Sequence, residues 1–187
     1  MVEITNKVEI ETRDGWRAWL AENHATESFC WLPVTRGMWG ASGKRGISYL
    51  DAVEEALCFG WIDSTSKDGY QRFSPRTKKS NWTELNRVRC ERLERLGLMT
   101  DAGRAVLPTK PFKIHPEAMK AIESDPVVFA NFNSFPEAYR RVRIDNIQSY
   151  FGSTCGTYEK RLDKFIENTR AGKMFGQWDD GGRLSEK

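Results

Sequence analysis

The residues of this sequence best suited to chemistry are cations and hydroxyls along one predicted strand. If residues 70–76 are extended, alternate side chains point the same way, and one face carries two guanidinium groups and two hydroxyls. These side chains are Tyr70, Arg72, Ser74 and Arg76. Guanidinium groups and hydroxyls bind carboxylates and phosphates, so this face predicts a groove for a small anionic ligand. A helix predicted to begin at Asn81 would add free backbone N–H groups nearby.

A glycine-rich segment is the second predicted wall of this groove. Glycines recur at every third position between residues 36 and 47, and one of them precedes Lys44 and Arg45. A Walker phosphate-binding loop would need glycine in place of Met38 and serine or threonine in place of Arg45, so nucleotide hydrolysis is not indicated. The segment bears Arg36, Lys44 and Arg45, of which Lys44 and Arg45 are candidate anion-binding residues, and its backbone N–H groups are a further candidate for anion binding. A plain flexible connector is the alternative for this segment.

A neighbouring predicted strand completes the candidate site. Trp61 and Asp63 share one face of that strand, where the indole is expected to line the groove. The alternative is structural, because arginines on a β-ribbon often pair with carboxylates. Arg72 and Arg76 would then pair with Asp63 or with acidic residues of the helix predicted over 48–58. Both interpretations stay open at the level of the sequence.

Catalytic and metal-binding patterns are sparse. The chain has only two histidines, His24 and His115, and no CxxC, HExxH or GxSxG spacing, so we expect no metal and no cofactor. Glu54 and Glu55 are adjacent on a predicted helix and are expected to point in different directions. No pattern calls for an enzyme. An enzyme acting on a phosphorylated or carboxylated small molecule in the same groove is nevertheless one alternative function.

Nucleic-acid binding is a further alternative, because basic clusters occur late in the chain. They are Arg140, Arg141 and Arg143, followed by Lys160, Arg161 and Lys164. Neither cluster matches a recognition-helix motif or has aromatic residues interleaved with the charges, so this alternative is the weaker one.

Length and composition require a folded chain. With 187 residues, 39% hydrophobic and seven tryptophans, the chain is too aromatic for a disordered tail. The net charge of +3 hides a local excess of positive charge, because the segment between Lys67 and Arg95 contains nine Lys and Arg residues but only four Asp and Glu. We expect no membrane span, and the first residues lack the pattern of a signal peptide, which favours the cytoplasm. The widely spaced cysteines, two of them in apolar surroundings, are expected to be reduced.

Periodicity predicts an α+β fold, in which a small, mostly antiparallel sheet packed by helices precedes a helical C-terminal part. The main helices are expected over 14–24, 48–59, 82–96, 117–123, 126–132, 136–151 and 156–171, with strands over 29–34, 60–63 and 70–74. Prolines at 108, 111 and 116 mark a linker. The predicted organisation is an N-terminal domain over 1–107, the linker over 108–116, a helical part over 117–173 and a frayed tail over 174–187.

Several long motifs resemble a known family. Residues 49–63, which end in Gly60-Trp61-Ile62-Asp63, are followed by similar motifs over 71–76, 80–82 and 99–103. In this order they resemble the YdeI/OmpD-associated bacteriocin-protection family. Pro116-Glu117, Asp125-Pro126, Phe129 and Phe132 are similar to its C-terminal region, so the resemblance covers essentially the whole chain.

The resemblance implies a protective role against bacteriocins or cationic antimicrobial peptides and a periplasmic setting for some members, and it points to no particular reaction. The sequence departs from the family pattern at one residue and in one short segment. Ser64 stands where the family usually has glycine, and residues 157–162 replace its Thr-Arg-x-Arg-Arg-Ile. We therefore expect a non-enzymatic stress-protection protein with an anion-binding groove, in which the late basic cluster carries less weight.

Overall fold

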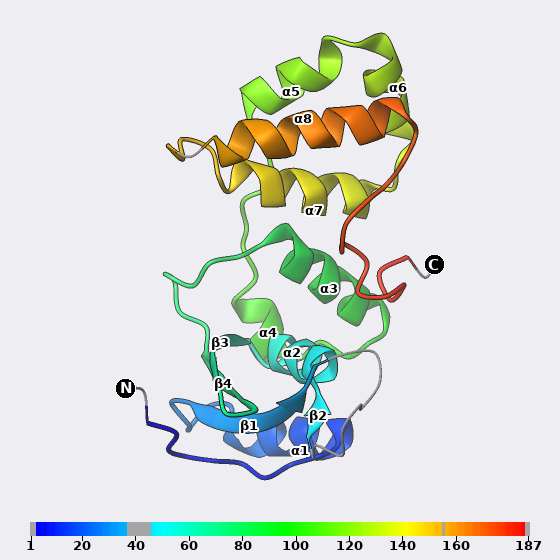
Figure 1. Cartoon of the computed structure of the whole chain (residues 1–187). Coiled ribbons are helices and arrows are strands. Elements are labelled where there is room, and N and C mark those ends of the chain that lie inside the picture. The colour runs from blue at the N-terminus through cyan, green and yellow to red at the C-terminus, as the bar shows by residue number, and fades with distance from the viewer. Residues whose placement is uncertain (1–2, 37–45, 155, 186–187) are drawn as a thin grey trace. The chain divides into compact units, whose positions relative to one another are not determined.

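The strands predicted around the groove form one four-stranded sheet in the computed structural model, which describes residues 3–36, 46–154 and 156–185 (Figure 1). The order is β2-β1-β4-β3. The strands are β1 (Cys30–Thr35), β2 (Ile47–Ser48), β3 (Trp61–Lys67) and β4 (Tyr70–Pro75). The β1–β4 and β3–β4 pairs are antiparallel, whereas the two-residue β2 runs parallel to β1. The α+β class is confirmed, with a mixed sheet.

A tight turn sets the register of the β3–β4 hairpin. Lys67 pairs with Tyr70, so only Asp68 and Gly69 lie between the strands. Both have positive φ, 50° and 85°, which is the conformation that Asp-Gly adopts in two-residue hairpin turns. The strand β3 therefore extends four residues beyond the predicted end at Asp63.

Most helices lie close to their predicted positions. They are α1 (Arg13–Asn23), α2 (Tyr49–Cys58), α3 (Glu84–Arg95), α4 (Asp101–Ala105), α5 (Pro116–Glu123), α6 (Pro126–Ser134), α7 (Glu137–Gln148) and α8 (Thr157–Arg170). Caps explain several starts, such as the side chain of Asp125, which accepts hydrogen bonds from the backbone N–H groups of Val127 and Val128. In the described residues, no helix combines the length and apolar character that crossing a bilayer requires.

The chain forms two compact units, and the boundary between them falls inside α3. The first unit comprises Met1–Asn81 and Arg89–Leu107, and the second comprises Trp82–Val88 and Pro108–Lys187. The sequence places the whole of this helix in the first part. Its beginning belongs to the second unit because Glu84, 2% exposed, is held there by Arg141 at 2.8 Å.

Tryptophans fill the core of the first unit. Trp16 of α1 is fully buried, stacks on Trp19 with ring centroids 5.1 Å apart, and contacts Phe73 of β4 at 5.4 Å. Trp19 meets Trp61 of β3 edge-on at 5.7 Å. The indole Nε1 of Trp16 also donates a hydrogen bond to the carbonyl of Ala52, 3.1 Å away. Trp16 therefore joins α1 to both the sheet and α2.

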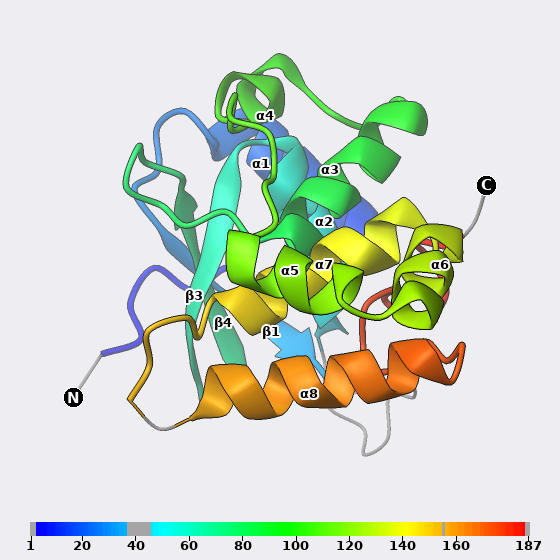
Figure 2. The same cartoon turned by 90° about the horizontal axis from the view of Figure 1, so that it is seen from above.

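The second unit is helical, and its core includes the end of the chain. In Figures 1 and 2, α8 lies alongside α7 and α6. Tyr139 and Phe165 are fully buried between these helices. The sequence predicts a frayed tail over 174–187, but Trp178 and Leu184 are buried in this core. The tail packs because the indole of Trp178 meets the ring of Tyr139 edge-on at 5.4 Å.

Helix α4 approaches α2 so closely that one position accepts only glycine. A Cβ atom at Gly103 would lie 2.3 Å from the carbonyl oxygen of Cys58. The hydroxyl of Thr100, which caps α4, donates to the same carbonyl at 2.6 Å. The start of α4 thus provides the hydrogen bond that the end of α2 would otherwise lack.

Replacing Gly103 with alanine should destabilise the protein by about 3 kcal/mol, because the added methyl group meets backbone that cannot rotate away. Gly97→Ala is the matched control, since Gly97 has a φ of 69° but no atom within 4 Å of its Cβ position. That control should lose only about 1 kcal/mol. Urea unfolding of both variants measures the difference, and equal losses would show that the close approach does not matter.

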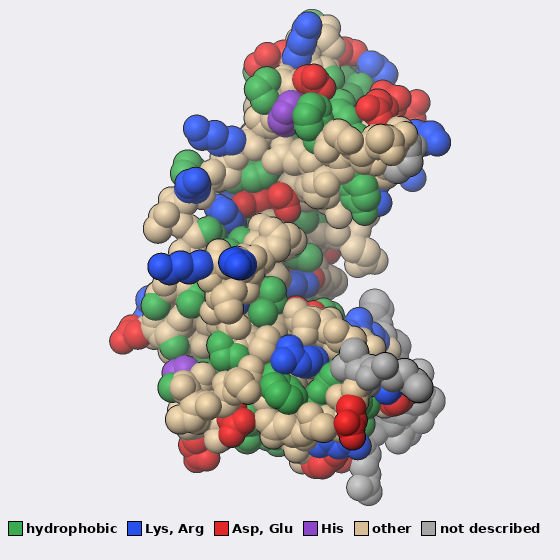
Figure 3. All heavy atoms as spheres, turned by 90° about the vertical axis from the view of Figure 1, so that its left-hand side faces the viewer, with side chains coloured by type: hydrophobic (Ala, Val, Ile, Leu, Met, Phe, Trp, Pro, Cys, Tyr) green, Lys and Arg blue, Asp and Glu red, His purple; other side chains and the backbone are tan. Residues whose placement is uncertain are grey.

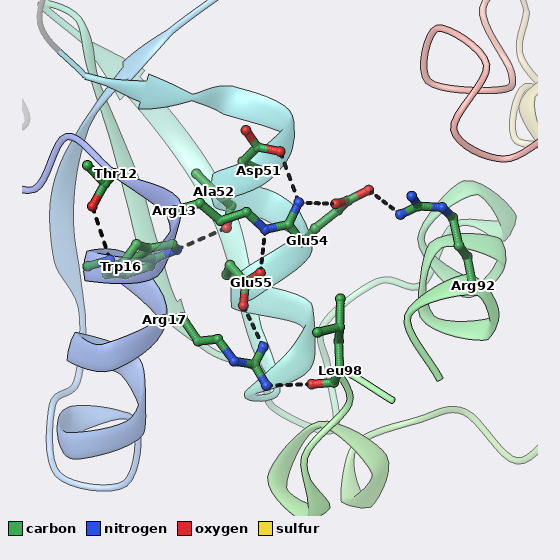
Figure 4. Close-up of polar contacts among 11 residues, drawn as sticks. Thr12, Arg13, Trp16, Arg17, Asp51, Ala52, Glu54, Glu55, Arg92 and Leu98 are labelled. Atoms are coloured by element: carbon green, nitrogen blue, oxygen red, sulfur yellow. Dashed lines mark hydrogen bonds and ion pairs between the residues drawn. The ribbon is translucent and has the colours of Figure 1, made fainter. Parts of the chain in front are cut away.

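Two buried carboxylates on α2 connect three helices (Figure 4). Glu54 and Glu55 are 0% and 1% exposed. Arg13 of α1 contacts both, with Nη1 3.0 Å from Glu54 Oε2 and Nε 2.6 Å from Glu55 Oε1. Arg17 contacts Glu55 at 2.7 Å, and Arg92 of α3 contacts Glu54 at 3.3 Å. The two carboxylates do not diverge as the sequence predicts, because one guanidinium is wide enough to bind both.

Replacing Arg13 with methionine should destabilise the protein by about 2 kcal/mol, because Glu54 and Glu55 stay buried and each loses an arginine partner, while Arg92 and Arg17 remain. The loss is smaller than for a fully isolated buried charge since those partners remain. Arg104→Met is the control, because Arg104 and its partners Glu94 and Asp101 are exposed. Thermal unfolding should show a clear loss for Arg13→Met and little change for Arg104→Met, and the reverse order would contradict the account.

Candidate functional site

The two arginines predicted to share a groove lie in different surroundings. The guanidinium carbon of Arg72 is 4.5 Å from the ring centroid of Phe29. Arg76 is buried, 7% exposed, and its Nη1 donates to the backbone carbonyl of Asn81 at 2.9 Å. Burial lowers the pKa of Arg76 to about 10, and the charge of Asp63 only partly offsets this. The strand β4 ends one residue before Arg76, so the predicted alternation of side chains does not reach it.

The start of α3 also differs from the prediction. Thr83 is the capping residue, since its hydroxyl accepts a hydrogen bond from the backbone N–H of Asn86 at 3.3 Å. The helix therefore begins at Glu84 rather than at Asn81. Asn81 is exposed, and its contact with Arg76 is made by its backbone oxygen.

Asp63 belongs to a polar cluster formed by Arg36, Tyr49, Asp63 and Gln71. We call it the Arg36 cluster. The hydroxyl of Tyr49 donates to Asp63 Oδ2 at 2.6 Å. The guanidinium carbon of Arg36 lies 4.1 Å from the ring centroid of Tyr49, and its Nη2 donates to Gln71 Oε1. Gln71 is 1% exposed and its Nε2 donates to the backbone carbonyl of Ser64 at 2.9 Å.

Strand pairing brings these residues together. Thr35 pairs with Ser48 in the parallel β1–β2 ladder. The residues that follow them, Arg36 after β1 and Tyr49 after β2, therefore lie close together. Asp63 pairs directly with Phe73, which places its side chain on the same sheet face as Gln71. A β-bulge follows Asp63 and leaves the nearby carbonyl of Ser64 free for the amide of Gln71.

The cluster contains one cation, Arg36, and one carboxylate, Asp63, which accepts the hydrogen bond of Tyr49. Burial raises the pKa of Tyr49 to about 12, and the hydrogen bond to Asp63 adds to this, so the phenol stays protonated at neutral pH. Tyr49 thus donates a hydrogen bond from its hydroxyl to Asp63 Oδ2, and Gln71 accepts a hydrogen bond from one nitrogen of Arg36, Nη2. The guanidinium of Arg36 is exposed and has five N–H donors in all. Its orientation is fixed by the ring below it and the amide beside it.

Sequence reasoning missed Tyr49 and Gln71 as members of the site. One signal could have found Gln71. It stands two residues before Phe73 on the inward side of β4, where an amide must be hydrogen bonded to be buried. Tyr49 has no comparable signal, because its hydrogen bond to Asp63 depends on how α2 packs on β3.

The remaining predicted site residues lie elsewhere or outside the described residues. Trp61 is 1% exposed, and its Nε1 donates to the backbone carbonyl of His24 at 3.1 Å, so its indole belongs to the core. Ser74 pairs with Ile62 and faces away from Gln71. Lys44 and Arg45 lie outside the residues that the structure describes. Across the described ranges, no three His, Cys, Asp or Glu side chains gather as a metal site would require.

The face drawn in Figure 3 carries charged side chains of both signs. On the face drawn in Figure 3, Lys and Arg side chains stand apart among neutral atoms and do not merge into one basic surface. On this face, anion binding would therefore rest on a few placed side chains rather than on the field of the whole face.

Comparison with known proteins divides the chain into two segments. No curated protein and no solved structure matches it. Residues 8–106, more than half of the chain, match the model of a domain of unknown function, DUF8412. Residues 111–172 match the family described as bacteriocin-protection, YdeI or OmpD-associated.

The second match confirms the resemblance inferred from the sequence and assigns it to the C-terminal segment, which contains Pro116, Asp125 and Phe132. The motifs over 49–63 and 71–76, and with them the Arg36 cluster, lie in the segment matched by the other model. The chain therefore belongs to the DUF8412 family of unknown function, and its segment 111–172 matches the model of the bacteriocin-protection family, YdeI or OmpD-associated.

Proposed function

We propose that this protein protects bacterial cells against bacteriocins or related stress without catalysing a reaction, and that it binds an anionic group at the Arg36 cluster. The description of the family that matches residues 111–172 supports the protective role. The geometry of Arg36 supports the binding role. Lys44 and Arg45 are included in the site on the sequence alone, because they follow Arg36 in the same glycine-rich segment.

The observation that carries the binding proposal is the positioning of one exposed cation. Arg36 is stacked on the ring of Tyr49 and hydrogen bonded to Gln71, which is itself anchored to Ser64. A guanidinium held in this way loses little conformational entropy when it binds an oxyanion. Structural arginines elsewhere in the first unit, such as Arg13, instead contact carboxylates.

The same geometry favours binding over catalysis. Because the pKa of Tyr49 is raised to about 12, its phenol is a poor base at neutral pH. Asp63 accepts the hydrogen bond of that phenol and so holds it in place. We propose action in the cytoplasm, since Cys30, Cys58 and Cys90 are free thiols buried in the fold, as is usual in a reducing compartment.

Sulfate is a suitable probe of the Arg36 cluster. A titration followed by NMR at the backbone amides of Tyr49 and Gln71 should saturate, and Arg36→Gln should weaken this binding by about tenfold or more. Arg72→Gln is the matched control, because Arg72 also lies over an aromatic ring but at Phe29. Sodium chloride at equal ionic strength corrects for screening. Unchanged affinity in Arg36→Gln, or equal weakening in both variants, would refute the site.

The protective role is tested by expressing the chain in a bacterial strain sensitive to a bacteriocin. Survival after exposure should rise with the wild-type chain and with Arg72→Gln, and it should not rise with Arg36→Gln at an equal level of folded protein. No protection by the wild-type chain would refute the protective role. Full protection by Arg36→Gln would refute the link between that role and the cluster.

A further inference from the structure

Two neighbouring helices of the second unit bring three basic side chains to one small area. Arg143 is on α7, and Arg161 and Lys164 lie one turn apart on α8, which runs beside α7 in both ribbon views. Not every basic residue of the predicted clusters belongs here. Arg141 is paired with the buried carboxylate of Glu84 at 2.8 Å.

One aromatic ring gathers two of these cations. The guanidinium carbon of Arg143 is 4.4 Å from the ring centroid of Phe175, and Nζ of Lys164 is 5.7 Å from the same centroid. The backbone then passes directly against Arg143, since a Cβ at Gly176 would lie 2.7 Å from its Nη1. Arg161 stacks on Tyr150 at 4.1 Å. Aromatic faces thus hold the three cations in defined positions.

The three cations lack an internal counter-ion. In the described part of the chain, none of Arg143, Arg161 and Lys164 forms an ion pair with a carboxylate, and Arg161 donates to the neutral amide oxygen of Asn146 at 2.7 Å. Nε of Arg143 is buried, and no atom of the described residues accepts a hydrogen bond from it. Burial lowers the pKa of Arg143; Tyr139 partly offsets this, and the charge of Arg161 adds to the lowering, so the positive charge of Arg143 is unfavourable in this position.

We propose that Arg143, Arg161 and Lys164 form a binding site for a compact, doubly charged oxyanion, the phosphate group of a small phosphorylated molecule. Such an anion would relieve the repulsion between the two arginines and accept charge-assisted hydrogen bonds from all three side chains. The site is in the second unit and is independent of the Arg36 cluster, so it does not rest on the proposed function.

The geometry favours a compact phosphate over a nucleic acid. Binding to single strands uses exposed aromatic faces on which bases stack. Here Arg143 and Arg161 already cover faces of Phe175 and Tyr150. Three cations on two adjacent helices also suit one phosphate group better than an extended backbone, which needs positive charge along its length.

The test is a titration of the whole chain with inorganic phosphate and, in a second arm, with a simple phosphate monoester, followed by NMR at the backbone amides of Arg143 and Lys164. We expect saturating shifts, with affinity about tenfold weaker in Lys164→Gln. Lys164 is exposed, so this variant should fold normally. Lys120→Gln on α5 is the matched control, and both it and Arg36→Gln should bind like wild type.

Two results would overturn the proposal. One is a response that does not saturate and is the same in wild type and Lys164→Gln, because this indicates only ionic screening. The other is a saturating response at these amides to a short oligothymidylate but to neither phosphate probe, which would assign the surface to nucleic acid. A stronger response to the monoester than to free phosphate would support the proposal and identify a phosphorylated molecule as the ligand.

Discussion

The burial of two adjacent carboxylates is the constraint on which the first unit depends. Glu54 and Glu55 lie on α2, and neither can be solvated where it stands. Each must keep an arginine partner, and these partners come from α1 and from α3. The positions of three helices are thereby linked. Because α2 starts at Tyr49, the same constraint positions the ring that supports Arg36.

Arginine has two distinct uses in this fold. Where a guanidinium meets buried carboxylates, as at Arg13 and Arg141, its charge is neutralised within the protein and it stabilises packing. Where a guanidinium lies over an aromatic ring, as at Arg36 and Arg143, it is oriented without being neutralised. The second arrangement retains the capacity to bind an external anion, and both proposed sites are built on it.

Features that depend on residues close together in the chain, such as helix ends and tight turns, could be predicted from the sequence. The helix predicted over 126–132 forms as α6, with Asp125 as its cap, and the strands predicted over 60–63 and 70–74 form a hairpin joined by Asp68-Gly69. Non-local contacts escaped prediction. The strand β2 is too short to have a pattern, and Trp178 is buried only because Tyr139 receives it.

The candidate site was predicted only in part, for the same reason. Asp63, one of the predicted site residues, contacts Tyr49, whose ring also supports Arg36, whereas the predicted Lys44 and Arg45 lie outside the described residues. Arg72 and Arg76 were expected to share a strand face, but β4 ends before Arg76 and the side chain of Arg76 is buried. The end of a strand depends on the packing around it. The alternation of apolar and polar residues in the sequence does not reveal that end.

The central claim, that a stacked and hydrogen-bonded Arg36 binds an anion, is tested most directly by a crystal structure of the whole chain grown in sulfate. The account predicts a sulfate ion within hydrogen-bond distance of the Arg36 guanidinium, with Tyr49 and Gln71 in their present contacts. An Arg36 side chain that has left the ring of Tyr49 and pairs with a carboxylate of this chain would contradict it.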